Sequence, residues 1–206
     1  MVAVLDYGIG NLRSAQKALQ RVGADARLTS DHALIADAAG IVLPGVGAFG
    51  RCVEALEVSG LTETALETAS DAAAGGRPFL GICVGMQLLF EESAESPATK
   101  GLGVMAGRVE RLSGDVKCPQ MQWNRLDVLK PGELLAGLPE EAWMYFVHGY
   151  AAPVGPDTVA TCVYGSPLCA AVRRGNLWGV QFHPEKSGTT GLTLLENFVS
   201  TLVGVR

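Results

Sequence analysis

The first half of the chain alternates short apolar runs with longer amphipathic stretches. The apolar runs that predict buried strands cover residues 2–5, 24–28, 40–43 and 77–80, the last leading into Cys83. Apolar residues at helical spacing predict helices over residues 12–22, 48–58 and 61–74, and again from Met86 through Leu88, Leu89 and Phe90. This rhythm is typical of a parallel sheet covered by helices.

The second half of the chain has a different character. Strand-like runs separated by short Gly, Pro and Asn turns cover residues 108–112, 126–129, 143–147, 158–164, 168–173 and 177–182. A closing helix is predicted over residues 192–203. Because no repeat or long linker divides the chain, we expect one α/β domain over residues 1–206, with a central, mostly parallel sheet, flanking helices and added antiparallel strands.

Composition narrows the classes of function. The chain has 206 residues, 48% of them hydrophobic, which suffices for a large core. A net charge of -5 without a basic run argues against nucleic acid as a partner. The N-terminus lacks the basic segment of a signal peptide, and no apolar run approaches the ~18 residues of a membrane span, so we expect a cytoplasmic protein with no membrane partner. The five cysteines include no CxxC pair, so neither disulfides, a metal nor a cofactor is expected.

One cysteine stands in a setting that favours catalysis. Residues 81–85 read GICVG, between the apolar strand and the following helix. Glycines on both sides allow a sharp strand-to-helix turn, a nucleophile elbow in which Cys83 replaces the usual serine. The partial positive charge at the helix N-terminus would favour the thiolate, which is the reactive form. The alternative is a small buried cysteine between packing glycines, and the position of both glycines at this junction favours the catalytic interpretation.

The general base has three candidates, since the chain contains only His32, His148 and His183. His183 is the best, because it ends a strand-like run and Glu185 follows two residues later. Alternate residues of a strand share a face, so this carboxylate can orient the imidazole. We therefore predict a Cys83, His183 and Glu185 triad. Taken alone, His183 could be a strand-end histidine and Glu185 a solvated loop residue.

A glycine-rich loop at residues 45–50 (GVGAFG) follows the third strand. It fits the dinucleotide-binding fingerprint, but that site also needs an acidic residue near the end of the following strand, about 20 positions on. Here two helical stretches come first, and the next clear strand instead runs into Cys83. We rank that function below an oxyanion hole, in which backbone N–H groups of Val84 and of the loop at Val46 and Gly47 would hold the developing negative charge. A tight turn without a ligand remains an alternative for the loop.

At this point the chain resembles the class I glutamine amidotransferases, and among them the glutaminase subunits of imidazole glycerol phosphate synthase. The segments that carry the resemblance span nearly the whole chain, at residues 6–12 (DYGIGNL), 44–47 (PGVG), 81–87 (GICVGMQ), 145–148 (YFVH) and 182–187 (FHPEKS). One segment departs from the family pattern: residues 119–124 read PQMQWN, with Gln120 and Gln122 where the family has histidine and glycine. The family places this segment near the partner subunit, so the departure affects details of the interface.

The resemblance implies the flavodoxin-like amidotransferase fold and a mechanism. Cys83 attacks the side-chain amide of glutamine, His183 protonates the departing ammonia, and water then releases glutamate from the thioester. The family uses no metal or cofactor in this reaction. Residues matching the family's glutamine contacts are Gln87, Gly149 and Tyr150, and residues expected at the interface are Trp123, Asn124 and Lys186.

The resemblance also implies a partner and a form of regulation. The partner is a (β/α)8-barrel cyclase subunit that receives the ammonia and makes imidazole glycerol phosphate for histidine synthesis. Rotation of the peptide at Gly45 and Val46 on partner binding would complete the oxyanion hole, and we expect Gly45 to make that rotation easy. Two other functions stay open: a glutaminase subunit for pyridoxal phosphate or anthranilate synthesis, and a non-enzymatic module with Cys83 as a redox sensor.

Overall fold

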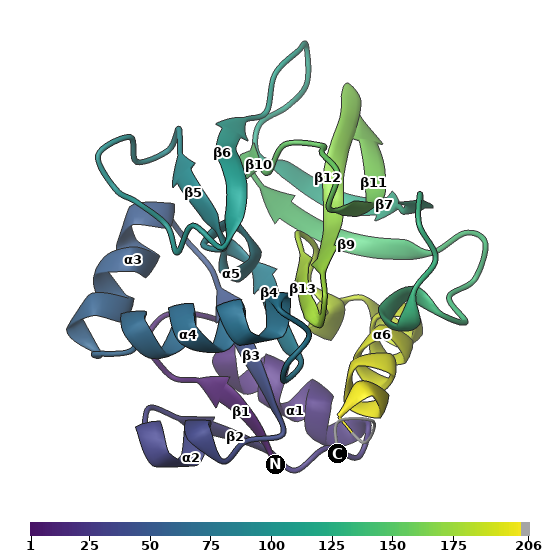
Figure 1. The fold of residues 1–206 in the computed structure, drawn as a ribbon. Coiled ribbons are helices and arrows are strands. Elements are labelled where there is room, and N and C mark those ends of the chain that lie inside the picture. The colour runs from purple at the N-terminus through teal and green to yellow at the C-terminus, as the bar shows by residue number, and fades with distance from the viewer. Residues whose placement is uncertain (203–206) are drawn as a thin grey trace.

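The computed structural model describes residues 1–202 and is organised around one eight-stranded sheet (Figure 1). The strand order is β2-β1-β3-β4-β13-β12-β11-β8. The strands are β1 (Val2–Leu5), β2 (Ala26–Thr29), β3 (Gly40–Gly45), β4 (Phe79–Cys83), β8 (Asp127–Val128), β11 (Thr158–Tyr164), β12 (Ser166–Arg174) and β13 (Leu177–Val180). From β2 to β13 neighbouring strands are parallel, and from β13 to β8 they are antiparallel. The predicted mostly parallel sheet with antiparallel additions is therefore confirmed.

Helices cover both faces of the sheet. α1 (Leu12–Arg21) packs beside α6 (Gly188–Thr201) on one face, and α3 (Phe49–Val58) lies with α4 (Thr62–Ala73) on the other (Figure 1). The remaining short helices are α2 (His32–Ala36), α5 (Val84–Gln87) and the 3-10 turns η1 (Glu133–Leu135) and η2 (Pro184–Lys186). No helix in the described part of the chain is both long and apolar enough to cross a membrane.

Two small sheets stand beyond the carboxyl end of the central strands. β5 (Phe90–Ser93), β6 (Met105–Arg111) and β10 (Tyr150–Ala151) form one, and β7 (Gln120–Arg125) pairs with β9 (Trp143–His148) in the other. The sequence pattern missed β5, β7, β10 and α2. The pairing of β5 with β6 is parallel, contrary to the antiparallel additions expected in this half.

Several predicted boundaries need correction. The helix expected from Met86 through Phe90 ends at Gln87, because Leu102 N–H and Met105 N–H bond the carbonyls of Leu88 and Leu89 and draw the chain toward β5. The strand expected over 177–182 ends at Val180. The closing helix begins at Gly188, four residues before its predicted start, and the predicted end at 203 lies outside the described residues.

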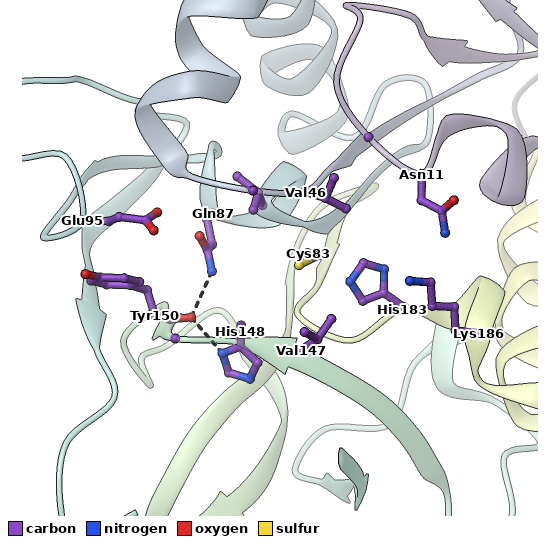
Figure 2. Close-up of a pocket in the computed structure, with 14 residues that line it drawn as sticks. Asn11, Val46, Cys83, Gln87, Glu95, Val147, His148, Tyr150, His183 and Lys186 are labelled. Atoms are coloured by element: carbon purple, nitrogen blue, oxygen red, sulfur yellow. Dashed lines mark hydrogen bonds between the residues drawn. The ribbon is translucent and has the colours of Figure 1, made fainter. Parts of the chain in front are cut away.

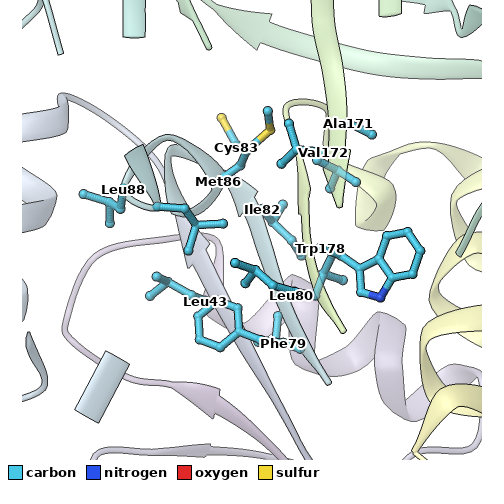
Figure 3. Close-up of a cluster of buried hydrophobic side chains, with 14 of the residues drawn as sticks. Leu43, Phe79, Leu80, Ile82, Cys83, Met86, Leu88, Ala171, Val172 and Trp178 are labelled. Atoms are coloured by element: carbon cyan, nitrogen blue, oxygen red, sulfur yellow. The ribbon is translucent and has the colours of Figure 1, made fainter. Parts of the chain in front are cut away.

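The core lines both faces of the central strands, and Leu43, Leu80, Ile82 and Trp178 are among its buried side chains (Figure 3). All five residues of β4 are buried. Since the sheet is covered on both faces, alternation between apolar and polar residues disappears in β3 and β4, and continuous apolar runs take its place. These runs hold β4, which ends in Cys83, in the middle of the sheet.

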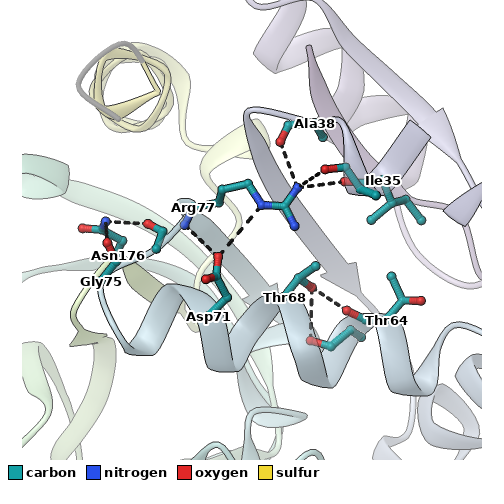
Figure 4. A network of polar contacts seen from close by, with 11 residues as sticks. Ile35, Ala38, Thr64, Thr68, Asp71, Gly75, Arg77 and Asn176 are labelled. Carbon is teal, nitrogen blue, oxygen red and sulfur yellow. Dashed lines mark hydrogen bonds and ion pairs between the residues drawn. The ribbon is translucent and has the colours of Figure 1, made fainter. Parts of the chain in front are cut away.

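Polar contacts fix the loop that precedes β4 (Figure 4). The Arg77 guanidinium donates to the carbonyls of Ile35 and Ala38, at 3.2 and 3.1 Å, and also to that of Ala36. It thereby joins the end of α2 to the start of β4. The Arg77 N–H donates to the Asp71 carboxylate at 2.9 Å, which ties the same loop to α4.

Candidate active site

Cys83 lies on a sharp turn between β4 and α5. Its backbone angles are φ 56° and ψ -113°, and it is the only non-glycine residue with a positive φ among residues 1–202. For a side chain with a Cβ this conformation is strained, and such strain gathers at functional sites. The elbow predicted from GICVG is therefore present. α5 has a single turn, so its dipole is weaker than the full helix that was expected there.

Three glycines allow this turn by close packing. A Cβ on Gly81 would lie 2.7 Å from the Gly85 carbonyl oxygen, and a Cβ on Gly85 would overlap the carbonyl oxygen of Leu43. A Cβ on Gly45 would lie 2.6 Å from the backbone nitrogen of Gly85. Gly45 lies in the extended strand β3. Glycine at position 45 therefore also has a steric reason, because β3 and the elbow contact each other backbone to backbone there.

His183 and Glu185 are in contact, although not by the expected geometry. His183 Nδ1 lies 2.8 Å from Glu185 Oε1, and both side chains are 2% exposed. The run that was read as a strand through His183 stops at Val180, and Glu185 lies in the 3-10 turn η2. Because the turn brings the two residues together, strand alternation was the wrong reason for a correct pairing.

The surroundings of His183 favour its protonated form. Burial lowers its pKa, but Cys83 and Glu185 outweigh that effect and raise the pKa to about 9. His183 Nε2 is buried and has no hydrogen-bond partner among the described residues. The nitrogen not used by Glu185 is therefore available to exchange a proton with Cys83 or with a substrate atom.

The other two histidines are poor candidates for the base. His32 lies on the surface in α2, with Nδ1 2.8 Å from the Thr64 hydroxyl. His148 lines the cavity, but burial lowers its pKa to about 4, so it is neutral near pH 7. Its Nδ1 lies 2.8 Å from the Tyr150 carbonyl oxygen, which requires a proton on that nitrogen. His148 is therefore placed to position Tyr150.

A cavity of about 440 Å³ opens above Cys83 (Figure 2). It is lined by Gly10, Asn11, Val46, Gly47, Cys83, Val84, Gln87, Glu95, Val147, His148, Gly149, Tyr150, His183 and Lys186. In Figure 2 Cys83 lies between Gln87 and His183, with the Val46 loop along one side. The structure thus gathers the predicted nucleophile, base, oxyanion donors and glutamine contacts, together with Lys186, around one space.

The predicted oxyanion donors border this cavity. Val46 and Gly47 follow β3, and Val84 follows the nucleophile. Among residues 1–202, neither Val46 N–H nor Gly47 N–H donates to another backbone carbonyl. The N–H groups of Val46 and Gly47 are therefore available to donate to a developing oxyanion.

Gln87 is more constrained than a surface helix residue. Its side-chain nitrogen donates to the Tyr150 carbonyl and to Gln181 Oε1, each at 3.0 Å. Both hydrogens of the nitrogen are thus committed, and the amide oxygen is the atom left for a ligand. The structure joins Gln87 and Tyr150 directly, which the sequence could not predict.

Sequence reasoning missed three polar residues at the site, of which Glu95 lines the cavity and accepts a hydrogen bond from Phe49 N–H at 2.8 Å. Gln181 is fully buried, and its side-chain nitrogen lies 3.7 Å from the Cys83 sulfur. Asn11 Nδ2 lies 3.5 Å from Glu185 Oε1 and so contacts the outer side of the proposed triad. Gln181 lies one residue past the end of β13, and its closeness to His183 in the sequence was the only signal for it. Asn11 carried no such local signal.

Comparisons with known proteins show the family of this chain. The family model "Glutamine amidotransferase class-I" matches residues 3–202. The chain belongs to the class I glutamine amidotransferases. Among similar amidotransferases is the "Imidazole glycerol phosphate synthase subunit HisH" of Methanothermobacter thermautotrophicus, 47% identical over 203 residues, or 98% of this chain and 99% of that protein. The protein of the same name from Rhodopirellula baltica is 46% identical over 209 residues and the full length of both.

Solved structures support the amidotransferase fold. "Crystal structure of glutamine amidotransferase" has a TM-score of 0.74 at 23% identity and covers 99% of each chain. "Structure of PurLQS from Thermotoga maritima" has a TM-score of 0.71 at 22% identity and covers 98% of each chain. The expected class I amidotransferase fold is thus confirmed. Across the described part of this amidotransferase, no three His, Cys, Asp or Glu side chains gather as metal ligands.

The residues predicted for a partner interface are spread over two places. Trp123 and Asn124 lie in β7 and do not line the cavity. Trp123 is 47% exposed, whereas the Asn124 side chain donates to the Val163 carbonyl at 2.9 Å within this amidotransferase. Lys186 is exposed at the edge of the cavity. Trp123 and Lys186 are therefore the two side chains free to meet another molecule.

Proposed function

We propose that this amidotransferase is the glutaminase subunit of imidazole glycerol phosphate synthase. Two observations support the proposal. Relatives that carry that name share 46 to 47% of their residues with this chain over nearly the full length of both. The contact between His183 and Glu185 beside Cys83 provides the chemistry, and this contact carries the proposal.

The positions of these groups support the following reaction. The Cys83 thiolate attacks the side-chain amide carbon of glutamine. The N–H groups of Val84, Val46 and Gly47 donate hydrogen bonds to the oxygen on which negative charge develops. His183, protonated on Nε2, donates that proton to the departing nitrogen as the C–N bond breaks, which yields ammonia and a glutamyl thioester. His183 then accepts a proton from water, which attacks the thioester, and glutamate and the thiol are released.

Glu185 and the cavity residues serve this cycle without reacting. Glu185 holds Nδ1 of His183 and stabilises the imidazolium, because a carboxylate at 2.8 Å favours the charged form. The amide oxygen of Gln87 and the backbone of Gly149 and Tyr150 are placed to bind the amino-acid end of glutamine. Gln181, which we did not predict, contacts the Cys83 sulfur and would orient the nucleophile.

In this proposal the ammonia passes to a partner subunit. A (β/α)8-barrel cyclase subunit would dock over the cavity, with Trp123 and Lys186 at the interface, and receive ammonia without its release to water. The cyclase would join ammonia to a phosphoribulosyl-formimino aminoimidazole carboxamide ribotide, which would yield imidazole glycerol phosphate and release an aminoimidazole carboxamide ribotide. The exposed positions of Trp123 and Lys186 support this orientation.

The test combines the chain with a cyclase subunit of imidazole glycerol phosphate synthase. Glutamate release is measured with and without the cyclase's nucleotide ligand, for the native chain and for Cys83→Ala. We expect release that rises on adding partner and ligand, and none above background for Cys83→Ala, whose thermal unfolding should be nearly unchanged. Substantial release by folded Cys83→Ala would end the nucleophile assignment, and activation only by another synthase would reassign the pathway.

A further inference from the structure

The proposed oxyanion loop is held from behind by two buried donors. The Tyr7 hydroxyl donates to the Pro44 carbonyl oxygen at 2.6 Å, and the Cys52 thiol donates to the Val46 carbonyl oxygen at 3.4 Å. Tyr7 follows β1 and Cys52 lies in α3, so the loop is anchored to two separate elements. Their exposed fractions are 3% and 0%. The catalytic cycle described above uses neither residue.

Both groups remain donors near neutral pH. Burial, followed by the neighbouring Cys52 thiol, raises the pKa of Tyr7 well above its ordinary value. Burial also raises the pKa of Cys52, to about 11. Each group therefore keeps its proton, and a carbonyl oxygen is the partner that such a proton needs in a buried site.

The direction of one loop N–H follows from peptide geometry. A trans peptide is planar, so its C=O and N–H bonds point to opposite sides. The Val46 carbonyl points toward Cys52, which does not line the cavity, so Gly47 N–H points away from α3. Gly47 itself lines the cavity and has φ 88°, a region that glycine adopts readily. Its N–H is thus directed to the cavity side of the loop.

We propose that Tyr7 and Cys52 are positioning residues for the oxyanion hole. Their hydrogen bonds fix the two peptides on either side of the Gly45–Val46 bond and hold Gly47 N–H toward the developing oxyanion. Any rotation on partner binding is then confined to the peptide between Gly45 and Val46. The inference rests on the proposed glutaminase function, because only an acyl-transfer reaction needs this N–H.

The test uses Tyr7→Phe, Cys52→Ala and Cys52→Ser in the full chain bound to its cyclase partner. Loss of a whole oxyanion donor lowers kcat by about 10²- to 10³-fold, so a misoriented donor should lower it by about 3- to 30-fold. We expect this loss in Tyr7→Phe and Cys52→Ala with KM within about twofold, and recovery in Cys52→Ser, whose hydroxyl also donates. Cys169→Ala is the matched control, because Cys169 is equally buried in β12, and it should keep full activity.

A second measurement separates positioning from general damage. Iodoacetamide alkylates Cys83 by displacement of iodide from carbon, so no oxyanion forms, and its rate at Cys83 should be unchanged in all four variants. Wild-type kcat in folded Tyr7→Phe and Cys52→Ala would overturn the proposal, as would a parallel fall in alkylation or an equal loss in Cys169→Ala. If Cys52→Ala does not fold, Tyr7→Phe decides alone. Failure of the proposed function itself would appear separately, as glutamate release by Cys83→Ala.

Discussion

Replacing Glu185 by glutamine would remove the charge beside His183 while keeping a hydrogen-bond acceptor there. The pKa of His183 is raised from 6.5 to about 9, which corresponds to about 3 kcal/mol in favour of the imidazolium. Cys83 and Glu185 together cause this rise. If Glu185 supplies about half, its loss costs about 1 to 2 kcal/mol, or on the order of 10-fold in kcat. That loss is smaller than the near-complete loss expected for Cys83→Ala or His183→Ala, because an orienting group does less than groups that bond or transfer protons.

The raised pKa of His183 sets the direction in which stability and kcat change with pH. His183 has a higher pKa in the folded chain than in the unfolded chain, so its imidazolium stabilises the fold fully below pH 6.5 and ceases to do so as pH rises through about 9. In Glu185→Gln the alkaline fall of kcat should therefore move to lower pH. The difference in melting temperature between native chain and variant should also shrink between pH 6 and pH 9.5.

Steady-state glutamate release in the complex and thermal unfolding, both across this pH range, provide the measurements. Glu133→Gln is the matched control, since it removes the same charge from a carboxylate that bonds Arg173 at 2.6 Å outside the cavity. It should leave the alkaline limb of kcat in place. A Glu185→Gln variant with the native alkaline limb and kcat within about twofold would refute the reasoning, and Glu185 would then be a packed carboxylate only.

Three further changes test other parts of the structure. His148→Ala should raise KM for glutamine about tenfold with kcat within about threefold, because it frees the Tyr150 carbonyl; a kcat loss equal to that of His183→Ala would transfer the role of base to His148. Gly85→Ala should lower the free energy of unfolding by about 3 kcal/mol or more, since its Cβ overlaps backbone, whereas Gly155→Ala, in open space, should stay within about 0.5 kcal/mol in urea titrations. Arg77→Met should cost about 2 kcal/mol in the same titrations through lost bonds to backbone carbonyls, and a change below 0.5 kcal/mol would contradict that role.

Much of the fold could be predicted because the signals for it are local. The runs at 2–5 and 158–164 match β1 and β11 to the residue. Periodicity failed where burial is uniform: the apolar residues from Met86 to Phe90 are all buried, so no pattern showed where α5 ends. It failed again at β7, where Met121 and Trp123 are exposed and the strand presents no apolar face to a core.

At the candidate site, too, local features could be predicted from the sequence and contacts between distant segments could not. The elbow at Cys83 was readable because its glycines are adjacent in sequence. Contacts between distant segments were not: Asn11 reaches Glu185, and Gln87 reaches Tyr150 and Gln181, across 63 to 174 positions. The steric role of Gly45 could not be predicted for the same reason, because the Gly85 backbone that excludes a side chain there belongs to another strand-to-helix junction.

The central position of β4 has a consequence for how the molecule folds. β4 pairs with β3 on one side and with β13 on the other, and β13 (Leu177–Val180) lies near the end of the chain. While the chain is being synthesised, the four strands made first can pair, but β4 is then an open edge of apolar residues. Such an edge invites pairing with a second chain, and slow long-range pairing prolongs the risk. β4, which ends in the proposed nucleophile, is thus open to aggregation until β13 has been synthesised and pairs with it.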